Sequence, residues 1–416
     1  MRKRKKAAER SGFMKNLSIF LSFLLLLLLT GCVPPGEVLR FVPESDDSVR
    51  IGVLLPVSGP NAARGRKMLE GARFAADELN SRRGHFGRQV ELLAFDTAGT
   101  EEGARQALKA AVSAGAVGVV GGYSTGETRV MADLAIKNRV PLVVPMATGN
   151  DDVIGVNSFV YRVAFTDKQQ SEMLAGYMRY YRQVKRLIVT VSSDPSDVYS
   201  RNVARDTAAS FREVGGEVAS VCEINDAAPE KHLIDAMSFA PEAILLPFEG
   251  KKAARYFKIL RQSGYMGIIC GPDSWDDPAF FKELQGVKNP GLNFYTAFFS
   301  DSARHSEYRS FKENFRKKCY YYPGSCEIQT FDAINTLLAG LGNNASSLKK
   351  FDRNWRSLRK YAGAAAIYTM LPKNQIDRTI YINRVGVSQT DRKRLVPGNI
   401  TGLQYSRLKV YDVDDE

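Results

Sequence analysis

Residues 50–80 read RIGVLLPVSGPNAARGRKMLEGARFAADELN, and this stretch sets the pattern for most of the chain. The apolar run at 49–57 is short and nearly continuous, which is typical of a buried strand in a parallel sheet. A loop around Pro60 ends the run, and residues 65–82 then place apolar side chains at helical spacing. A strand that leads through a glycine and proline loop into an amphipathic helix is the unit of an α/β fold.

The same strand and helix unit recurs in two series. In the first series, strands are predicted at 89–97, 116–122 and 140–147, and helices at 101–115 and 128–139. The second series, with the same alternation, begins with a strand at 185–193. We therefore expect an α/β protein with two similarly built lobes, each containing a mostly parallel sheet flanked by helices.

Glycine, proline and small residues gather where the strands of the first series end, at 56–61, 121–127 and 145–150. In open α/β sheets the ligand crevice lies outside the carboxyl ends of the strands. These three loops are therefore expected to share one rim of a ligand cleft.

The N-terminus reads as an export signal. Residues 1–10 are strongly basic, Leu17–Leu29 is almost wholly apolar, and Leu29-Thr30-Gly31-Cys32 follows. The apolar run is too short to span a bilayer comfortably and matches the core of a signal peptide. The tetrapeptide resembles the lipobox of bacterial lipoproteins, which makes 1–31 the signal peptide and Cys32 the lipidated residue. An uncleaved anchor is the alternative, and Met14 is a second candidate start.

The formal net charge of +13 raises nucleic acid or an anionic surface as a partner. Six of the Lys and Arg residues lie in the first ten positions and belong to the leader. The remaining basic residues mostly alternate with acids, and the denser runs near Arg316 and Arg392 are short. Since no aromatic residues are interleaved with a basic motif, we expect solvated surfaces and no nucleic-acid partner.

Four cysteines follow Cys32, an even number that suits an oxidising compartment. Cys319 and Cys326 bracket the turn-rich YYYPGS segment and form the candidate disulfide. Cys222 and Cys270 are read equally well as a second pair or as free buried thiols. The three histidines are scattered, and no Cys or His spacing indicates a metal site.

Several segments together resemble the branched-chain amino-acid (Leu/Ile/Val) binding proteins of ABC transporters, which have the type I periplasmic-binding fold. The resemblance runs from about Val49 to Asp332 and is firmest in the first lobe. It rests on the order and spacing of these strings: the opening at 50–80, HFGRQVELLAFDTAGT, VGVVGGYSTGET, VPLVVPMAT, FVYRVAFTDKQQ and SGYMGIICGPDSW.

The resemblance implies that the chain passes three times between the lobes, near residues 165, 296 and 365. After a linker at 32–48, each lobe is then discontinuous. The first lobe combines 49–165 with about 297–365, and the second combines about 166–296 with 366–408. A hinge of this kind lets two rigid lobes close on a ligand.

The resemblance also places ligand contacts in the first lobe. The hydroxyl that binds the ligand carboxylate falls on Thr125 or its neighbour Ser124, in a loop that includes Tyr123. Met146, with Ala147 beside it, supplies backbone N–H groups, and Thr148 supplies a second hydroxyl. The alternative reading of such hydroxyls is helix capping.

The second lobe is expected to supply an aromatic residue and an acid for the ligand ammonium. SSDPSDVYSRN resembles a family turn that maps the aromatic onto Tyr199, although Ser200 replaces the usual glycine. The acid maps onto Glu249, Glu230 or Asp226. Trp275 follows a predicted strand and is expected either to line the cleft or to pack under it.

Arg64 occupies a position in the opening loop where the family often has an aromatic residue. A guanidinium can pair bidentately with a carboxylate. One hypothesis is therefore a ligand more acidic or polar than leucine; the alternative is an Arg64 side chain that points into solvent.

The sequence favours binding over catalysis. It has no Gly-x-Gly-x-x-Gly after a strand, no Walker-type GKS/T and no GxSxG elbow, and nothing calls for a cofactor. We expect a non-enzymatic solute-binding lipoprotein, anchored in the cell envelope and facing the periplasm, that delivers an amino-acid-like ligand to ABC permease subunits. A ligand sensor or protein-docking lipoprotein of the same fold is the alternative.

Overall fold

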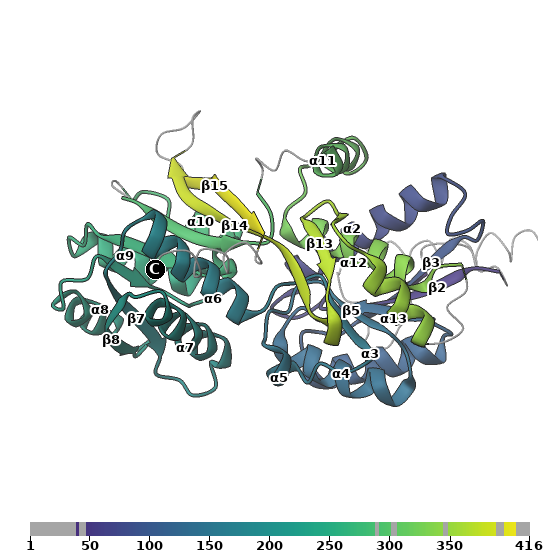
Figure 1. Ribbon diagram of the computed structural model, residues 1–416, viewed down its shortest axis with the longest axis horizontal. Coiled ribbons are helices and arrows are strands. Elements are labelled where there is room, and N and C mark those ends of the chain that lie inside the picture. Colours follow the sequence, from purple (N-terminus) through teal and green to yellow (C-terminus); the bar gives the residue numbers. More distant parts are fainter. Residues whose placement is uncertain are drawn as a thin grey trace, which may run out of the picture.

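A computed structural model describes residues 39–40, 47–287, 291–300, 306–343, 348–387 and 395–404. The expected signal peptide and Cys32 lie outside these residues. The described chain forms two α/β lobes side by side, with strand β14 running from one to the other (Figure 1). Within the described ranges, no helix has both the length and the apolar character needed to cross a membrane.

The first lobe is built on a six-stranded sheet of order β1-β3-β2-β4-β5-β6. All neighbours pair in parallel except β1, which runs antiparallel to β3. Its strands are β1 (Leu39–Arg40), β2 (Val49–Leu55), β3 (Val90–Asp96), β4 (Gly118–Gly121), β5 (Leu142–Val144) and β6 (Val160–Arg162). The helices that connect them are α2 (Ala62–Ser81), α3 (Glu101–Ser113), α4 (Thr125–Asn138) and α5 (Asp151–Ile154).

The second lobe contains a parallel core of strands in the order β11-β10-β9-β7-β8, to which β14 and β15 are added antiparallel at the β11 edge. Its strands are β7 (Arg186–Ser192), β8 (Glu217–Ile224), β9 (Ala243–Leu245), β10 (Ile268–Gly271), β11 (Asn293–Ala297), β14 (Ile376–Val387) and β15 (Leu395–Gln404). Its helices are α6 (Asp167–Gly176), the π-helix η1 (Tyr177–Tyr181), α7 (Val198–Glu213), α8 (Pro229–Met237), α9 (Gly250–Gln262), the 3₁₀ turn η2 (Asp273–Trp275) and α10 (Pro278–Glu283).

After β11 the chain returns to the first lobe, where α12 packs against α2, β4 and β5. The returning elements are α11 (Ser306–Cys319), α12 (Ser325–Leu341), α13 (Leu348–Ser357), β12 (Tyr361–Ala362), β13 (Ile367–Met370) and the 3₁₀ turn η3 (Pro372–Asn374). Strand β14 then pairs with β13 at its start and with β11 farther on. The third passage between the lobes therefore lies within β14, later in the chain than the expected position near 365.

Hydrophobic burial explains why the opening segment forms this core. In β2 every residue is buried except Arg50, as expected for a central parallel strand covered on both faces. Helix α2 buries one face and meets α12 at Gly71, where an added Cβ would lie 2.1 Å from the Glu327 carbonyl oxygen. Only glycine allows the two helix backbones to approach this closely.

The four described cysteines are all unpaired, so the expected disulfide between Cys319 and Cys326 is not formed. The two thiols face different neighbours. Cys319 ends α11 near Glu70 of α2, whereas Cys326 lies in the first turn of α12 and faces Arg64. Helix packing therefore directs the side chains apart although the connecting loop is short.

The three passages between the lobes meet at Arg378, which is fully buried. Its guanidinium donates to the Val163 carbonyl just after β6 and to the Phe298 carbonyl just after β11, both at 2.6 Å. It also donates to the Gln329 side chain on α12 at 3.1 Å. One side chain on β14 thus joins both other passages, and this set of contacts is called the hinge cluster below.

We expect Arg378→Met to lower the free energy of unfolding by about 3 kcal/mol, because buried carbonyl and amide oxygens lose their charged donor. The matched control is Arg384→Met on the same strand, where the side chain is exposed and the effect should stay within about 0.5 kcal/mol. Urea unfolding followed by circular dichroism measures both. Equal effects of the two substitutions would contradict the role given to the hinge cluster.

Candidate functional site

A cleft of about 420 Å³ lies between the lobes, where strand-end loops of the first sheet face those of the second. The predicted ligand contacts line it, with the exception of Trp275 and of the two alternative acids Asp226 and Glu230. The first lobe contributes Arg64, Glu101, Tyr123, Ser124, Thr125, Gly126, Arg129, Met146, Ala147 and Thr148. The second contributes Ser196, Asp197, Val198, Tyr199, Glu249, Asp273 and Ser274. This cavity is called the polar cleft below.

The start of helix α4 forms the first-lobe wall of the polar cleft. Ser124 is its N-cap: it accepts from the Glu127 N–H at 3.3 Å, and its own hydroxyl donates to the Glu127 carboxylate at 2.8 Å. Thr125 is the first residue of the helix and packs beside Gly149, where a Cβ would lie 2.5 Å from the Thr125 methyl. Capping therefore occupies the Ser124 hydroxyl, and Thr125 is the better placed of the two candidates.

The loop after β5 adds Met146, Ala147 and Thr148 to the same wall. The Ala147 N–H already donates to the Gly122 carbonyl at 3.1 Å, so it serves the loop itself. The Thr148 carbonyl accepts from the Asp167 N–H at 2.6 Å, and its hydroxyl hydrogen-bonds the Asp167 carboxyl group. This wall is therefore tied directly to α6, the first helix of the second lobe.

The second-lobe wall centres on Asp273, which the sequence reasoning missed. Its carboxylate accepts from the Tyr199 hydroxyl at 2.8 Å, and its N–H donates to the Gln170 side chain at 3.1 Å. Asp273 begins the turn that follows β10, in the GPDSW segment. Its position just after a strand end, opposite the first-lobe loops, is the signal that would have found it.

The sequence allows two positions for Trp275, in the wall of the cleft or beneath it. In the structure it lies beneath the cleft. The side chain is fully buried, stacks on Phe280 at 4.8 Å between ring centroids, and donates its indole N–H to the Leu246 carbonyl. The tight turn points Asp273 into the cleft and Trp275 into the core two residues later.

Of the three acids proposed for the ligand ammonium, only Glu249 lines the polar cleft. Asp226 is ion-paired with Lys252 at 2.8 Å and accepts from the Tyr256 hydroxyl. Glu230 lies 3.8 Å from Arg255 on the surface. The short segment before α8 keeps both of these acids away from the cleft.

Arg64 joins the two lobes across the cleft. Its guanidinium donates to the Tyr123 hydroxyl at 2.8 Å and forms an ion pair with Asp277, the N-cap of α10. The side chain thus has partners in both lobes and does not point simply into solvent. Two further residues, Ser325 and Asp276, make a second hydrogen bond between the lobes.

Two carboxyl groups lie along the second-lobe side, Asp167 fully buried and Asp273 half-buried. Burial raises the pKa of Asp167 to about 7, and the nearby Asp273 charge raises it further. Burial also raises the pKa of Asp273. Burial disfavours the ionised form of both carboxyl groups. A cation bound beside them would favour the ionised form, because opposite charges attract.

The raised pKa of Asp167 should make the protein less stable as pH rises. The unfolded chain loses this proton near pH 4 and the folded chain near pH 7, so the protonated fold is favoured at low pH and the preference is lost across this window. Asp167→Asn removes the penalty, so its melting temperature should exceed that of the unchanged protein by more at pH 8 than at pH 5. Scanning calorimetry measures this, with Asp235→Asn on the exposed side of α8 as the control; a constant difference would contradict it.

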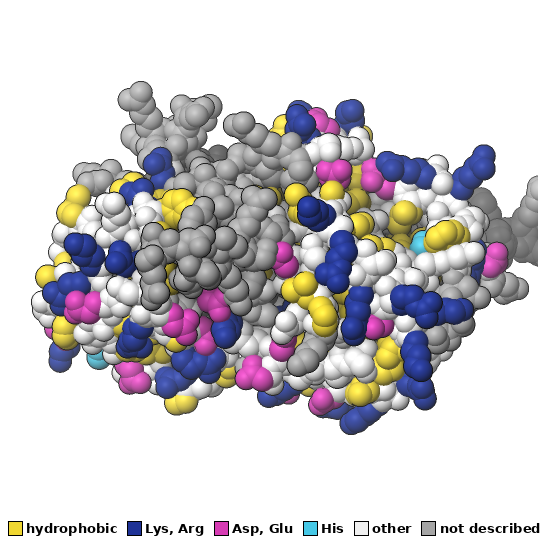
Figure 2. Space-filling model, in the orientation of Figure 1, with side chains coloured by type: hydrophobic (Ala, Val, Ile, Leu, Met, Phe, Trp, Pro, Cys, Tyr) yellow, Lys and Arg dark blue, Asp and Glu magenta, His cyan; other side chains and the backbone are white. Residues whose placement is uncertain are grey.

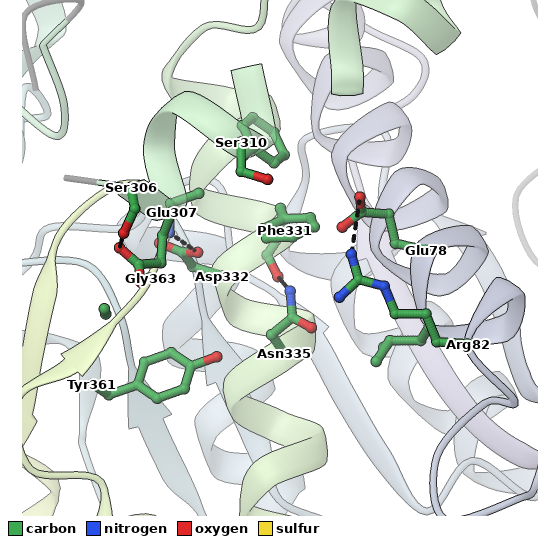
Figure 3. A pocket seen from close by; sticks show the side chains of 14 residues that line it. Glu78, Arg82, Ser306, Glu307, Ser310, Phe331, Asp332, Asn335, Tyr361 and Gly363 are labelled. Carbon is green, nitrogen blue, oxygen red and sulfur yellow. Dashed lines mark hydrogen bonds and ion pairs between the residues drawn. The ribbon is translucent and has the colours of Figure 1, made fainter. Parts of the chain in front are cut away.

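A second pocket, of about 370 Å³, lies on the outer side of the first lobe between α2, α11 and α12. Several of its polar groups are already paired, as the dashed lines in Figure 3 show. Arg82 lies 3.9 Å from Glu78, and the Asn335 amide donates to the Phe331 carbonyl at 3.0 Å. Asp332 accepts from the Ala364 N–H at 2.7 Å. The first two pairings lie within single helices, and the third joins α12 to the segment before β13. The polar cleft, which both lobes line, is the better candidate site.

The surface carries no single dominant charged face in the view of Figure 2, where Lys and Arg side chains are spread over both lobes with Asp and Glu among them. Among the residues that the structure describes, no cluster of three or more His, Cys, Asp or Glu side chains could hold a metal ion.

Two α/β lobes joined by three passages, with opposed strand-end loops lining the space between them, define a two-lobed ligand-binding protein. The chain belongs to the periplasmic binding protein family, whose profile matches residues 48–391.

Known relatives agree with this assignment. A Leu/Ile/Val-binding protein, BraC3, of Rhizobium johnstonii is 32% identical over 151 residues, which cover 36% of this chain and 41% of that protein. Leu/Ile/Val-binding protein homolog 3 of Brucella melitensis is 31% identical over 39% of this chain and 44% of its own length. The matched segment thus spans less than half the length of these curated relatives.

Solved structures share the fold over a longer stretch. The leucine binding protein LivK from Thermotoga maritima superposes with a TM-score of 0.73 at 24% identity, covering 85% of this chain and 98% of that one. The branched-chain amino acid transporter substrate binding protein LivJ from Streptococcus pneumoniae, in complex with isoleucine, gives 0.71 at 20% identity, covering 85% and 99%. At these identities the likeness establishes the fold.

Proposed function

We propose that the protein captures a small amino-acid-like ligand in the polar cleft and presents it to an ABC importer. The observation that carries this proposal is the polarity of the two walls. The first lobe offers the Thr125 and Thr148 side chains at the start of α4 and after β5, and the second offers the carboxylates of Asp273 and Glu249. An α-amino acid carries the two complementary charges.

The ligand carboxylate is assigned to the first-lobe wall. A helix N-terminus presents unsatisfied N–H groups and the positive end of the helix dipole, which favours an anion. Helix α4 extends from Thr125 to Asn138, and its first turn lines the polar cleft. Thr125 is the hydroxyl partner in this assignment, because the Thr148 hydroxyl is already hydrogen-bonded to the Asp167 carboxyl group.

The ligand ammonium is assigned to Asp273, with Glu249 nearby. Tyr199 holds the Asp273 carboxylate in place through a 2.8 Å hydrogen bond, so the group is oriented before the ligand arrives. The pKa of Asp273 is raised by burial, and an ammonium at this point offsets that cost. Asp273 thus takes the place that the sequence analysis gave to Asp226, Glu230 or Glu249.

Arg64 has a different role in this proposal from the one that its position in the sequence indicated. Because its guanidinium is shared between Tyr123 and Asp277, it links the lobes and forms the edge of the cleft. A second anionic group on the ligand would have to displace Asp277. A zwitterionic ligand with a single carboxylate suits this arrangement better.

The setting of the protein follows from its family and its leader. The likeness to transporter substrate-binding proteins supports permease subunits as partners, and the lipobox-like residues 29–32 support a lipid anchor at Cys32. We therefore place the chain in the cell envelope, lipid-anchored and facing the periplasm, with permease subunits as partners and a binding role without catalysis.

Asp273→Asn should weaken amino-acid binding at least about tenfold, since the ammonium loses its charged partner. The matched control is Asp226→Asn, an acid outside the cleft, which should leave affinity unchanged. Titration calorimetry against the twenty amino acids measures both, and the melting temperature of each variant checks its folding. Binding that survives Asp273→Asn would refute the assignment, and no binding by the unchanged protein would favour the protein-docking role.

A further inference from the structure

The parallel strands of the first lobe begin at one edge of their sheet, on the side away from the polar cleft (Figure 1). The register pairs Val49 with Val90 and Val119 with Leu142, so the connections that lead into β3, β4 and β5 lie together there. This surface is called the basal edge below, and it comprises residues 82–89, 114–117 and 136–141.

The basal edge is basic. Its sequences are RRGHFGRQ, AGAV and IKNRVP, which contain five Lys and Arg residues and no Asp or Glu. Arg82 and Arg88 each have an acidic partner on a neighbouring segment. The other three, Arg83, Lys137 and Arg139, are exposed, and no carboxylate within the described ranges forms an ion pair with them. The basal edge therefore presents positive charge to the surroundings.

The same edge exposes apolar side chains. Phe86 is 63% exposed, Val117 47% and Ile136 44%, one in each of the three connections. Apolar side chains set among cations are typical of a surface that contacts lipid head groups: the apolar groups enter the interface and the cations meet lipid phosphates. The basal edge combines both kinds of group.

The backbone of the first connection holds Phe86 away from the core. The His85 N–H donates to the Arg88 carbonyl at 2.8 Å, and the Arg88 N–H donates to the His85 carbonyl at 3.2 Å. Phe86 and Gly87 are the central residues of this tight turn, with φ of 52° and 85°, as a two-residue hairpin turn requires. The His85 Nε2 atom also contacts the Gly342 carbonyl oxygen at 2.8 Å, which fixes the turn to the end of α12. Phe86 thus lies at the tip of a well-held turn.

The expected lipid anchor can reach the basal edge. Strand β1 begins at Leu39, seven residues after Cys32, and Leu39 pairs with Ala94 of β3. Seven extended residues span at most about 25 Å. The four steps along β3 from Ala94 back to Val90 cover only about 13 Å. A lipid on Cys32 can therefore lie beside the basal edge while β1 stays paired.

The equivalent edge of the second lobe has the opposite charge. The connections into β8, β9 and β10 contain two acids, Glu217 and Glu242, and no Lys or Arg; they are residues 214–217, 238–242 and 263–267. An apolar side chain is exposed here too, since Met266 is 66% exposed. The two edges therefore resemble each other in exposed apolar groups and differ in charge, which makes the second-lobe edge a matched control.

We propose that the basal edge rests on the surface of an anionic lipid bilayer, with the Phe86 ring in the head-group region and Arg83 and Arg139 beside lipid phosphates. This inference goes beyond the proposed function and rests on the anchored setting given there. Because the basal edge lies opposite the polar cleft, the contact stands the molecule on its first lobe. The second lobe and the cleft are then held away from the bilayer, where ligand can enter from solvent.

The first test places the purified chain, with its lipid anchor, in vesicles of equal parts phosphatidylglycerol and acyl-brominated phosphatidylcholine. Both native tryptophans, Trp275 and Trp355, are fully buried, so a tryptophan added at the surface can be followed separately. Bromine should quench the added emission of Phe86→Trp at least about twofold more than that of Met266→Trp, because only the former enters the interface. Equal quenching of the two would overturn the inference.

Reversal of charge tests the electrostatic part. In the Phe86→Trp background, Arg83→Glu combined with Arg139→Glu should reduce the quenching at least about twofold, because the new carboxylates are repelled by phosphatidylglycerol. The control is Lys231→Glu combined with Lys251→Glu, which changes the net charge equally on the exposed surface of the second lobe and should leave quenching unchanged. Melting temperatures check the folding of each variant. The same loss of quenching in both pairs would contradict the docking of this edge.

A separate measurement distinguishes the docking from the anchor. Mass spectrometry of the peptide that contains Cys32 reports whether the lipid is present. If it is absent, the proposed anchor fails, and sedimentation of the chain with phosphatidylglycerol vesicles but not with phosphatidylcholine vesicles still supports the basal edge. If an unanchored chain sediments with neither, or an anchored Phe86→Trp chain is quenched in neither, the inference fails and a protein partner becomes the better occupant. Ligand binding in the polar cleft is independent of all these results.

Discussion

The hydrogen bonds of the Arg378 guanidinium are the constraint on which the two-lobed arrangement depends. Three separate segments pass between the lobes, and this side chain on β14 binds the carbonyl oxygens of the other two, at Val163 and Phe298. Gln329 connects the same group to α12. A buried cation that satisfies several acceptors stabilises the junction. Beside it, one cluster of buried apolar side chains runs through both lobes, and the cleft lies where their strand-end loops face each other.

The cleft follows from this junction and from the direction of the strands. Parallel strands in each lobe end at the same edge, so their loops meet in the space that the hinge leaves between the lobes. The first lobe brings a helix start and hydroxyls, and the second brings a tyrosine-held carboxylate at Asp273. Arg64, bonded to Tyr123 and Asp277, lines the polar cleft and connects the two lobes across it.

The parts of the site that could be predicted lie close together in the sequence. Thr125 and Thr148 follow strands whose apolar runs are plain, and a residue just after a parallel strand faces the crevice whatever its neighbours are. Asp273 obeys the same rule, whereas the 3₁₀ turn directs Trp275, two residues later, into the core. Asp226 and Glu230 lie in or beside a segment whose length differs from that of the family, and the backbone carries them to the surface.

The order of residues alone was enough for the α/β class, the two series of units and the first-lobe rim, because apolar periodicity and glycine-rich loops act over a few neighbouring residues. Tertiary structure decided what depends on distant segments. The contact of Gly71 with α12, the separation of Cys319 from Cys326 and the bridge from Arg64 to Tyr123 and Asp277 all arise when helices and passages pack. Such contacts join residues far apart in the chain, and no local pattern records which of them will meet.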